Sequence, residues 1–331
     1  MIIVIGASAG GLEACRKVVE AFPEDLEAAV FIVIHIPAQG VSVLPDLLSK
    51  WGNLPAVHPK DGDLIRPKAI YVAPPNHHML VKPHLVRIVS GPYENNSRPA
   101  VDPLFRTAAR AYGRQVIGVI LSGNLDDGTA GLRVVKKKGG TTVVQDPAEA
   151  AFKGMPASAV ESGMVDYILS INEIGPFLVS RVESEQLVAL SGNNPGKYNE
   201  RDILELTGAD LQEKVQSGMP TGFTCPECGG VLWEEINGDS ATFRCRVGHG
   251  FSVDYLESGL STTVEAALWN AVRVLEEKEQ IEKKLAARMN FLGNTKSAEH
   301  FRQQAGKASR DAGLIRELIV RKYGPETDRT D

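Results

Sequence analysis

Cysteine is scarce in this sequence, with four residues in a chain of 331. That number is too small for a disulfide framework, and three of the four lie close together in the last third of the chain, where they suggest a metal site. Long apolar runs are also missing, because none approaches the ~18 residues of a membrane span. The first residues lack the basic region and cleavage site of a secretory signal. We therefore expect a cytoplasmic protein without membrane insertion.

Positive charge is not in excess either. The formal net charge is −5, which argues against a general binder of polyanions such as nucleic acid. Apolar residues make up 43% of the chain, and this length and composition can support two or more packed domains.

The first eleven residues carry the most informative pattern. An apolar, mostly β-branched run up to Ile5 predicts a buried strand, and the segment Gly6–Gly11 predicts a sharp turn into a helix that begins near Leu12. Ser8 lies between Gly6 and Gly10, as the nucleophile does in a nucleophile elbow. Two other interpretations remain open: a loop that binds a phosphate or nucleotide, and a plain turn whose serine caps the helix.

Strands and helices alternate from residue 1 to about residue 182, which predicts an α/β fold with a doubly wound, mostly parallel sheet. The strand 29–34 leads into His35, and the strand 115–121 leads into a loop with Asp126 and Asp127. Functional groups of such sheets gather at the C-terminal ends of the strands. Ser8, His35 and one of these aspartates therefore supply the parts of a serine hydrolase triad.

Several features between residues 70 and 105 bear on the surroundings of this site. His78 follows a strand and a proline-rich loop that could wall a site, and 79–89 predicts a short hairpin. Arg98 lies in a polar loop before a helix. Asp102 and Pro103 predict the start of that helix, with Asp102 at the N-cap and Pro103 at the first helical position.

Taken together, these segments resemble the catalytic domain of the CheB-type chemotaxis methylesterases, which remove methyl groups from glutamyl esters of chemoreceptors. The resemblance covers about residues 1–182. It is carried by the stretches Ile5-Gly6-Ala7-Ser8-Ala9-Gly10-Gly11, His35-Ile36-Pro37, Tyr71-Val72-Ala73-Pro74, Arg98-Pro99-Ala100-Val101-Asp102, Val119-Ile120-Leu121-Ser122-Gly123, Asp127-Gly128 and Gly154-Met155-Pro156.

The resemblance implies Ser8 as nucleophile, His35 as general base and Asp127, which immediately precedes a glycine, as the orienting acid. It further implies an oxyanion hole from the backbone N–H groups near Ala9 and Asn124, and no cofactor for catalysis. Arg98, His78 and Met155 are candidate substrate contacts.

The chain departs from the family pattern in two ways. It reads Ser122-Gly123-Asn124-Leu125 where family members commonly read Thr-Gly-Met-Gly, so Leu125 stands in a glycine position. The receiver domain that usually precedes the catalytic domain is expected to be absent.

The rest of the chain predicts a linker at 183–221, with one short helix at 203–215, and a zinc-ribbon-like module at 222–256. A helical tail at 257–331 follows, with an amphipathic helix at 264–292 and a second helix that pairs with it as a hairpin. The four ligands expected for a structural Zn²⁺ are Cys225, Cys228, Cys245 and His249, which stand on two tight turns. The module and tail are predicted to contact a signalling partner.

The leading hypothesis is thus a protein-glutamate methylesterase that acts on a methylated receptor or another protein and also deamidates glutamine. The alternative is a phosphate- or nucleotide-binding or scaffold protein that uses the loop Gly6–Gly11, with the zinc module as a protein adaptor.

Overall fold

The computed structural model describes residues 1–36, 42–190, 219–237 and 240–323. These residues form two units, Met1–Leu256 and Glu257–Asp331, which are considered separately below. None of the described helices is long and apolar enough to cross a membrane.

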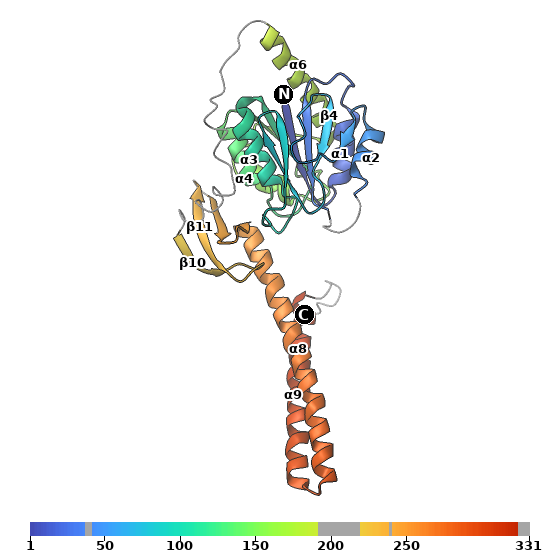
Figure 1. The fold of residues 1–331 in the computed structure, drawn as a ribbon, viewed down its shortest axis with the longest axis vertical. Coiled ribbons are helices and arrows are strands. Elements are labelled where there is room, and N and C mark those ends of the chain that lie inside the picture. Colours follow the sequence, from blue (N-terminus) through green and yellow to red (C-terminus); the bar gives the residue numbers. More distant parts are fainter. Residues whose placement is uncertain (37–41, 191–218, 238–239, 324–331) are drawn as a thin grey trace. The chain divides into compact units, whose positions relative to one another are not determined.

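A parallel sheet of seven strands forms the centre of the first unit, as the alternation of strands and helices predicted (Figure 1). Its strand order is β3-β4-β2-β1-β7-β8-β9. The central strand β1 pairs in parallel with β2 on one side and β7 on the other. The strands of this sheet are β1 (Ile2–Ala7), β2 (Ala29–Ile34), β3 (Ala56–Val57), β4 (Ala69–Val72), β7 (Val116–Ile120), β8 (Thr141–Gln145) and β9 (Tyr167–Leu169).

Helices cover both faces of the sheet. On one face, alternate residues of β1 such as Ile3 and Ile5 pack against α1, α2 and α6, and on the other face Ile2 and Val4 pack against α3, α4 and α5. Both sets are buried, which is why the central strands are almost continuously apolar. The helices are α1 (Gly11–Glu20), α2 (Leu44–Trp51), α3 (Val101–Tyr112), α4 (Thr129–Lys137), α5 (Gly154–Glu161) and α6 (Ile171–Leu190), with a 3-10 turn at Gly113–Gln115.

The first unit also contains two small antiparallel sheets. The predicted hairpin near residues 79–89 is confirmed as β5 (His78–Lys82) and β6 (Leu85–Val89). The second sheet is formed by β10 (Met219–Thr224), β11 (Val231–Asn237), β12 (Ser240–Cys245) and β13 (Gly250–Ser252). Its residues belong to the same unit as the seven-stranded sheet.

Much of the proposed linker lies outside the described residues, including the helix expected at 203–215. Helix α6 continues to Leu190 and β10 begins at Met219, so both extend into the range 183–221 that the sequence suggested as linker.

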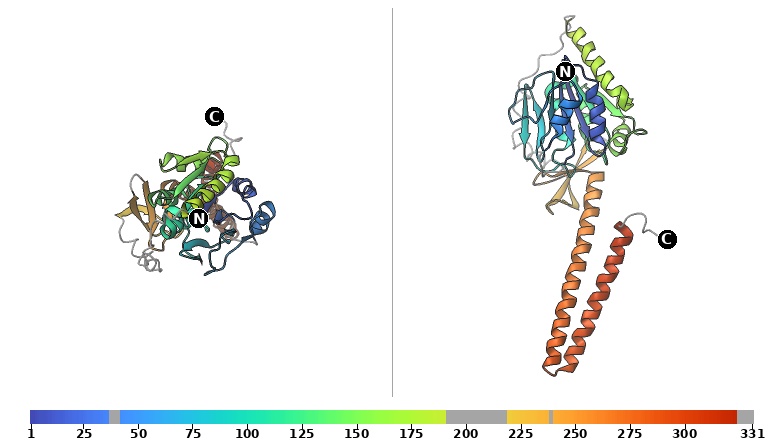
Figure 2. Two further views of the ribbon diagram at one scale, coloured as in Figure 1. Left: turned by 90° about the horizontal axis from the view of Figure 1, so that it is seen from above. Right: turned by 90° about the vertical axis from the view of Figure 1, so that its right-hand side faces the viewer.

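The second unit contains the predicted helical hairpin, formed by α8 (Val253–Phe291) from Glu257 onward and by α9 (Thr295–Tyr323), which lie side by side in both figures (Figures 1 and 2). Helix α8 begins eleven residues before the expected Val264, because the chain passes directly from β13 into the helix. Gly293, with φ of 75°, makes the turn between the helices.

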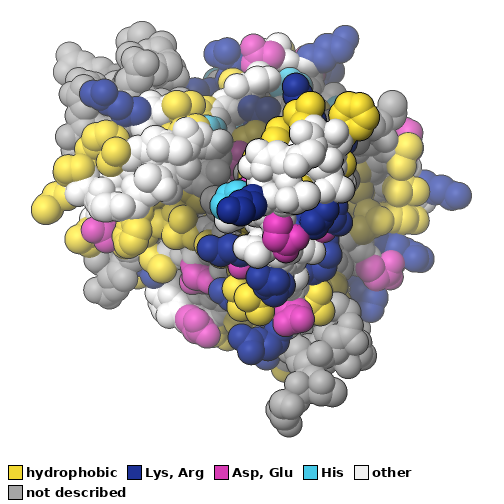
Figure 3. Space-filling view, turned by 90° about the horizontal axis from the view of Figure 1, so that it is seen from below, with side chains coloured by type: hydrophobic (Ala, Val, Ile, Leu, Met, Phe, Trp, Pro, Cys, Tyr) yellow, Lys and Arg dark blue, Asp and Glu magenta, His cyan; other side chains and the backbone are white. Residues whose placement is uncertain are grey.

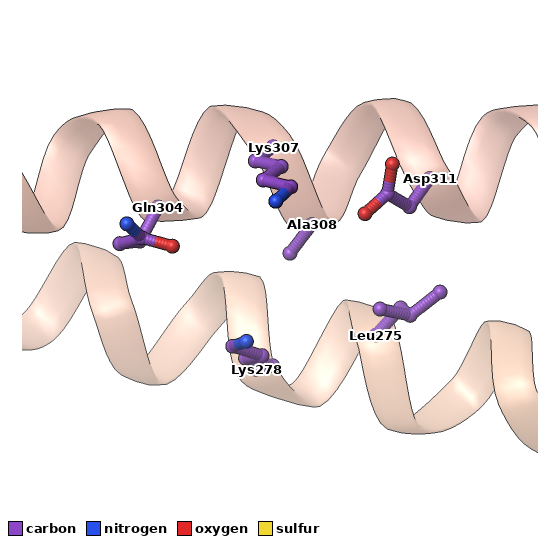
Figure 4. A pocket seen from close by; sticks show the side chains of 6 residues that line it. All are labelled: Leu275, Lys278, Gln304, Lys307, Ala308 and Asp311. Carbon is purple, nitrogen blue, oxygen red and sulfur yellow. The ribbon is translucent and has the colours of Figure 1, made fainter.

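Small side chains line the buried faces of α8 and α9. The buried face of α9 carries four alanines and Ile319, and α8 contributes Val272 and Ala286. Arg316 pairs with Glu276 across the two helices. Figure 4 shows the side chains from both helices that line a small, mainly polar pocket: Leu275, Lys278, Gln304, Lys307, Ala308 and Asp311.

Charges of both signs are intermixed with hydrophobic side chains on the face shown in Figure 3. This mixture agrees with the small net charge of the sequence.

Candidate active site

Ser8 lies in the turn between β1 and α1. Its backbone N–H donates to the carbonyl of Ser122 at 2.9 Å, and its own carbonyl accepts from Gly11 at 2.9 Å. Gly10 adopts the left-handed conformation, with φ of 70°, and a Cβ there would lie 2.7 Å from the Ser122 Oγ. Only glycine satisfies both demands without strain, so the Gly-rich turn holds Ser8 at the C-terminal edge of the sheet.

His35 and Asp127 complete a chain of hydrogen bonds that begins at Ser8. The Ser8 Oγ lies 3.1 Å from His35 Nδ1, and His35 Nε2 lies 2.7 Å from Asp127 Oδ2. An ionised carboxylate only accepts hydrogen bonds, so the proton of the neutral imidazole belongs on Nε2 and the lone pair of Nδ1 faces Ser8. This arrangement suits a base that removes the serine proton.

Asp127 is fully buried and is held by backbone donors as well as by His35. Its Oδ2 also accepts from Val101 N at 2.7 Å, and its Oδ1 accepts from Asp102 N at 3.3 Å. These are N–H groups of the first turn of α3, where the positive end of the helix dipole favours an anion. Burial opposes ionisation, but the His35 hydrogen bond and charge, with these donors, hold the pKa of Asp127 below its usual value.

The expected N-cap role of Asp102 is wrong. Helix α3 begins at Val101 with Ala100 at the N-cap, and the N–H groups of Val101 and Asp102 donate to Asp127, which comes from a distant loop. The Asp102 carboxylate instead accepts from Gly131 N at 2.6 Å. Burial, with the neighbouring charge of Asp127, raises the pKa of Asp102 well above its usual value.

Asn95 bridges the two carboxyl groups, and its role was not predicted from the sequence. Its Nδ2 donates to Asp127 Oδ1 at 2.9 Å and to Asp102 Oδ2 at 3.0 Å. The side chain is 4% exposed and the backbone φ is 50°. The only local sign in the sequence is the pair Asn95-Asn96 in a polar loop. Such a pair is typical of left-handed turn positions, but it does not show which groups the Asn95 side chain binds.

Asp126 points to a different partner from its neighbour. Its Oδ1 accepts from the hydroxyl of Ser252 at 2.7 Å. Burial and the charges of Asp254 and Asp127 raise the pKa of Asp126 to about 6, although the Ser252 hydrogen bond opposes this shift.

The backbone N–H groups suggested for the oxyanion hole belong to Ala9 and Asn124. Within the described residues neither group donates a hydrogen bond, so both are available to a ligand. Gly123 packs against Ser8, since a Cβ at Gly123 would lie 2.9 Å from the Ser8 Cβ. The next residue but one, Leu125, adopts a φ of 57°, which explains why a glycine suits this position.

The three candidate substrate contacts occupy different environments. Arg98 lines a cavity of about 240 Å³ beside His35, together with Ile36, Tyr93, Asn96, Ser97 and Pro99. Its guanidinium is fixed by Asn76 Oδ1 and the Gly91 carbonyl. His78 and Met155 are buried. His78 bonds to Pro92 O and Ala100 N and so supports the loops behind the cavity rather than lining it.

Three cysteines and one histidine converge in the small sheet of the first unit. The ligand atoms of Cys225, Cys228, Cys245 and His249 all lie within 4.8 Å of one another. The Cys228 and Cys245 sulfurs are 3.7 Å apart, and His249 Nδ1 lies 3.4 Å from the Cys245 sulfur. Two sulfurs bound to one zinc at about 2.3 Å and a tetrahedral angle lie about 3.8 Å apart, so this donor set fits Zn²⁺.

Comparisons with known proteins agree with one another. Residues 3–178 match the CheB methylesterase family. A protein-glutamate methylesterase/protein-glutamine glutaminase of Maricaulis maris is 36% identical over 186 residues, which are 55% of this chain and 46% of that protein. The crystal structure of the Thermotoga maritima CheB methylesterase catalytic domain is 32% identical with a TM-score of 0.53, and the match covers 54% of this chain and 97% of that domain.

The lengths of the relatives differ. A relative from Leptospira interrogans is 39% identical over 178 residues, which are 92% of its length. The chain spans about half the length of the Maricaulis maris protein and of a Pyrococcus horikoshii relative, at 46% and 53%.

Proposed function

The chain belongs to the CheB methylesterase family, whose match covers more than half of it, and from this premise we propose that it hydrolyses methyl esters of protein glutamyl side chains. The observation that carries the proposal is the continuous hydrogen-bonded series from Ser8 Oγ through His35 to the buried Asp127. A binding protein has no need for a serine hydroxyl that faces the lone pair of an imidazole.

In the proposed mechanism, the Ser8 Oγ attacks the ester carbonyl carbon while His35 Nδ1 accepts its proton. Asp127 stabilises the resulting imidazolium through Nε2. The N–H groups of Ala9 and Asn124 bind the oxyanion of the tetrahedral intermediate, and each is worth ~3 kcal/mol by comparison with other hydrolases. His35 then protonates the leaving methoxide, which departs as methanol and leaves an acyl-enzyme on Ser8.

Water completes the cycle. His35 removes a proton from a water molecule that attacks the acyl carbonyl, and the second tetrahedral intermediate collapses to free glutamate and Ser8. The same site deamidates glutamine if the first leaving group is ammonia. The names of the relatives include both activities.

We also propose that the Cys225, Cys228, Cys245 and His249 cluster binds a structural Zn²⁺. Its two turns are preformed, since Gly229 N donates to Cys225 O at 2.8 Å and Gly248 N donates to Cys245 O at 2.9 Å. The metal would join β10–β11 to β12–β13 in a sheet with little apolar core. We assign the module and the hairpin of α8 and α9 to contact with a methylated chemoreceptor-like substrate or a signalling partner.

The test is release of methanol from a methylated receptor fragment and of ammonia from its glutamine form. We expect both products from the parent protein. Ser8→Ala should release neither while keeping the circular dichroism spectrum and unfolding midpoint of the parent. Methanol release by Ser8→Ala at the parent rate would refute the assignment of Ser8.

A further inference from the structure

Asn95 has a partner for each polar atom of its side chain. Its two Nδ2 protons go to Asp127 and Asp102, and its Oδ1 accepts from the backbone N–H of Ser252 at 3.2 Å. This last bond fixes which way the amide faces. If the amide turned over, Nδ2 would face the Ser252 N–H and Oδ1 would face the two carboxyl groups, so every one of the three hydrogen bonds would be lost.

The donor to Asn95 Oδ1 comes from β13, the strand that directly follows His249. The backbone of β13 also binds the same loop, because Asn95 N donates to Gly250 O at 2.9 Å and Gly250 N donates to Tyr93 O at 3.2 Å. The same strand also contacts a second loop, because the hydroxyl of Ser252 donates to Asp126, the residue before Asp127. Strand β13 therefore touches both loops that shape the surroundings of Asp127.

Two further contacts join the metal module to the same loop. Glu94 pairs with Arg106 of α3 at 2.9 Å and with Arg244 of β12 at 3.6 Å. Gly248, in the turn between two of the ligands, packs so closely on Pro92 that a Cβ there would lie 2.8 Å from the proline Cγ. The turn Cys245–His249 is thus flanked on both sides by residues that contact the segment 92–95.

We propose that Asn95 is a positioning residue for the triad and that the Cys3His module, when its metal is bound, holds Asn95 in its working orientation. This inference rests on the proposed function. Without the metal, the turn that precedes β13 loses its cross-link, and the Ser252 N–H no longer selects one face of the Asn95 amide. Asp127 then loses a donor and can rotate away from His35.

The test compares four full-length proteins: the parent, Asn95→Ala, Cys228→Ser and the double variant. Cys228 is chosen because it lies on the turn between β10 and β11, remote in sequence from β13. Each single change should lower kcat and the rate of fluorophosphonate labelling of Ser8 about tenfold to a hundredfold, with little change in KM, as misplacement of a catalytic group does. The double variant should be no slower than Asn95→Ala, because both changes act through one contact. Val57→Ser, an exposed change on the edge strand β3 of the large sheet, serves as the control and should keep parent zinc content and rates.

A second readout does not depend on turnover. The proton between His35 Nε2 and Asp127 should give a downfield NMR resonance, and removal of zinc by a chelator should shift or broaden it in the parent but change it little in Asn95→Ala. A zinc-free parent with unchanged kcat, labelling rate and resonance would overturn the inference, and so would multiplicative losses in the double variant. If the parent neither hydrolyses the ester nor is labelled at Ser8, the proposed function is wrong. The NMR resonance would still show whether zinc binding affects the hydrogen bond between His35 and Asp127.

Discussion

Replacement of Asp127 by asparagine should damage both catalysis and folding. The carboxylate accepts four hydrogen bonds, from His35, Val101, Asn95 and Asp102, whereas an amide offers a single acceptor oxygen. If the amide oxygen faces His35, its NH₂ group confronts the donors of Asn95 and Asp102. If the NH₂ group faces His35, the imidazole must take the other tautomer, and Nδ1 can no longer accept the Ser8 proton.

The expected magnitudes follow from these two arrangements. Loss of the tautomer and of the charge that stabilises imidazolium lowers kcat by about 10³ to 10⁴, by comparison with other triad hydrolases. Two buried donors without acceptors cost about 1–3 kcal/mol each, and relief from burying a charge offsets part of this, so we expect a net loss of about 1–3 kcal/mol.

The assays are methanol release and urea unfolding, with Asp126→Asn as the matched control at the adjacent position. Asp126 contacts Ser252 rather than His35, and an asparagine oxygen still accepts that hydroxyl. Its kcat should stay within about twofold of the parent, since no group of the triad changes. A large kcat loss in Asp126→Asn, with near-parent activity in Asp127→Asn, would refute the reasoning.

The remaining predictions concern stability and metal content. Because the pKa of Asp126 is raised to about 6, its ionisation destabilises the folded state as pH rises from about 4 to 6, so Asp126→Asn should be about 1–2 kcal/mol more stable than the parent at pH 7 and equal to it at pH 3.5 in urea unfolding. Gly123→Ala should lower kcat about tenfold or more, because the new methyl group would lie 2.9 Å from the Ser8 Cβ. Leu125→Gly should leave the unfolding free energy within about 1 kcal/mol of the parent, because relief of the positive φ offsets the entropy of glycine. Elemental analysis should find one zinc per parent chain and substantially less in Cys225→Ser.

Periodicity predicted the parts of the fold that depend on local sequence. The strand 29–34 is β2 to the residue, and the ends of β1, β2 and β7 bring Ser8, His35 and Asp127 to one edge of the sheet. Strands that are apolar on both faces are typical of a buried parallel sheet. The apolar runs in the sequence were therefore enough to locate the C-terminal ends of these strands.

Long-range polar contacts were not predictable in this way. Asp102 has the residue type and position of an N-cap, yet the first turn of α3 is satisfied by Asp127, which lies 25 residues away in sequence. The position of His78 after a proline-rich loop predicts a residue in the wall of the site, but both of its ring nitrogens bond to the backbone, at Pro92 O and Ala100 N. Asn95 joins groups from three separate segments, and no local pattern encodes such a contact.

The central claim, that His35 and Asp127 activate Ser8, is tested most directly by labelling the full-length protein with a fluorophosphonate and mapping the modified peptide. The account predicts one adduct per chain on Ser8, with labelling strongly slowed in His35→Ala. An unlabelled parent, or an adduct on another serine that persists in Ser8→Ala, would contradict it.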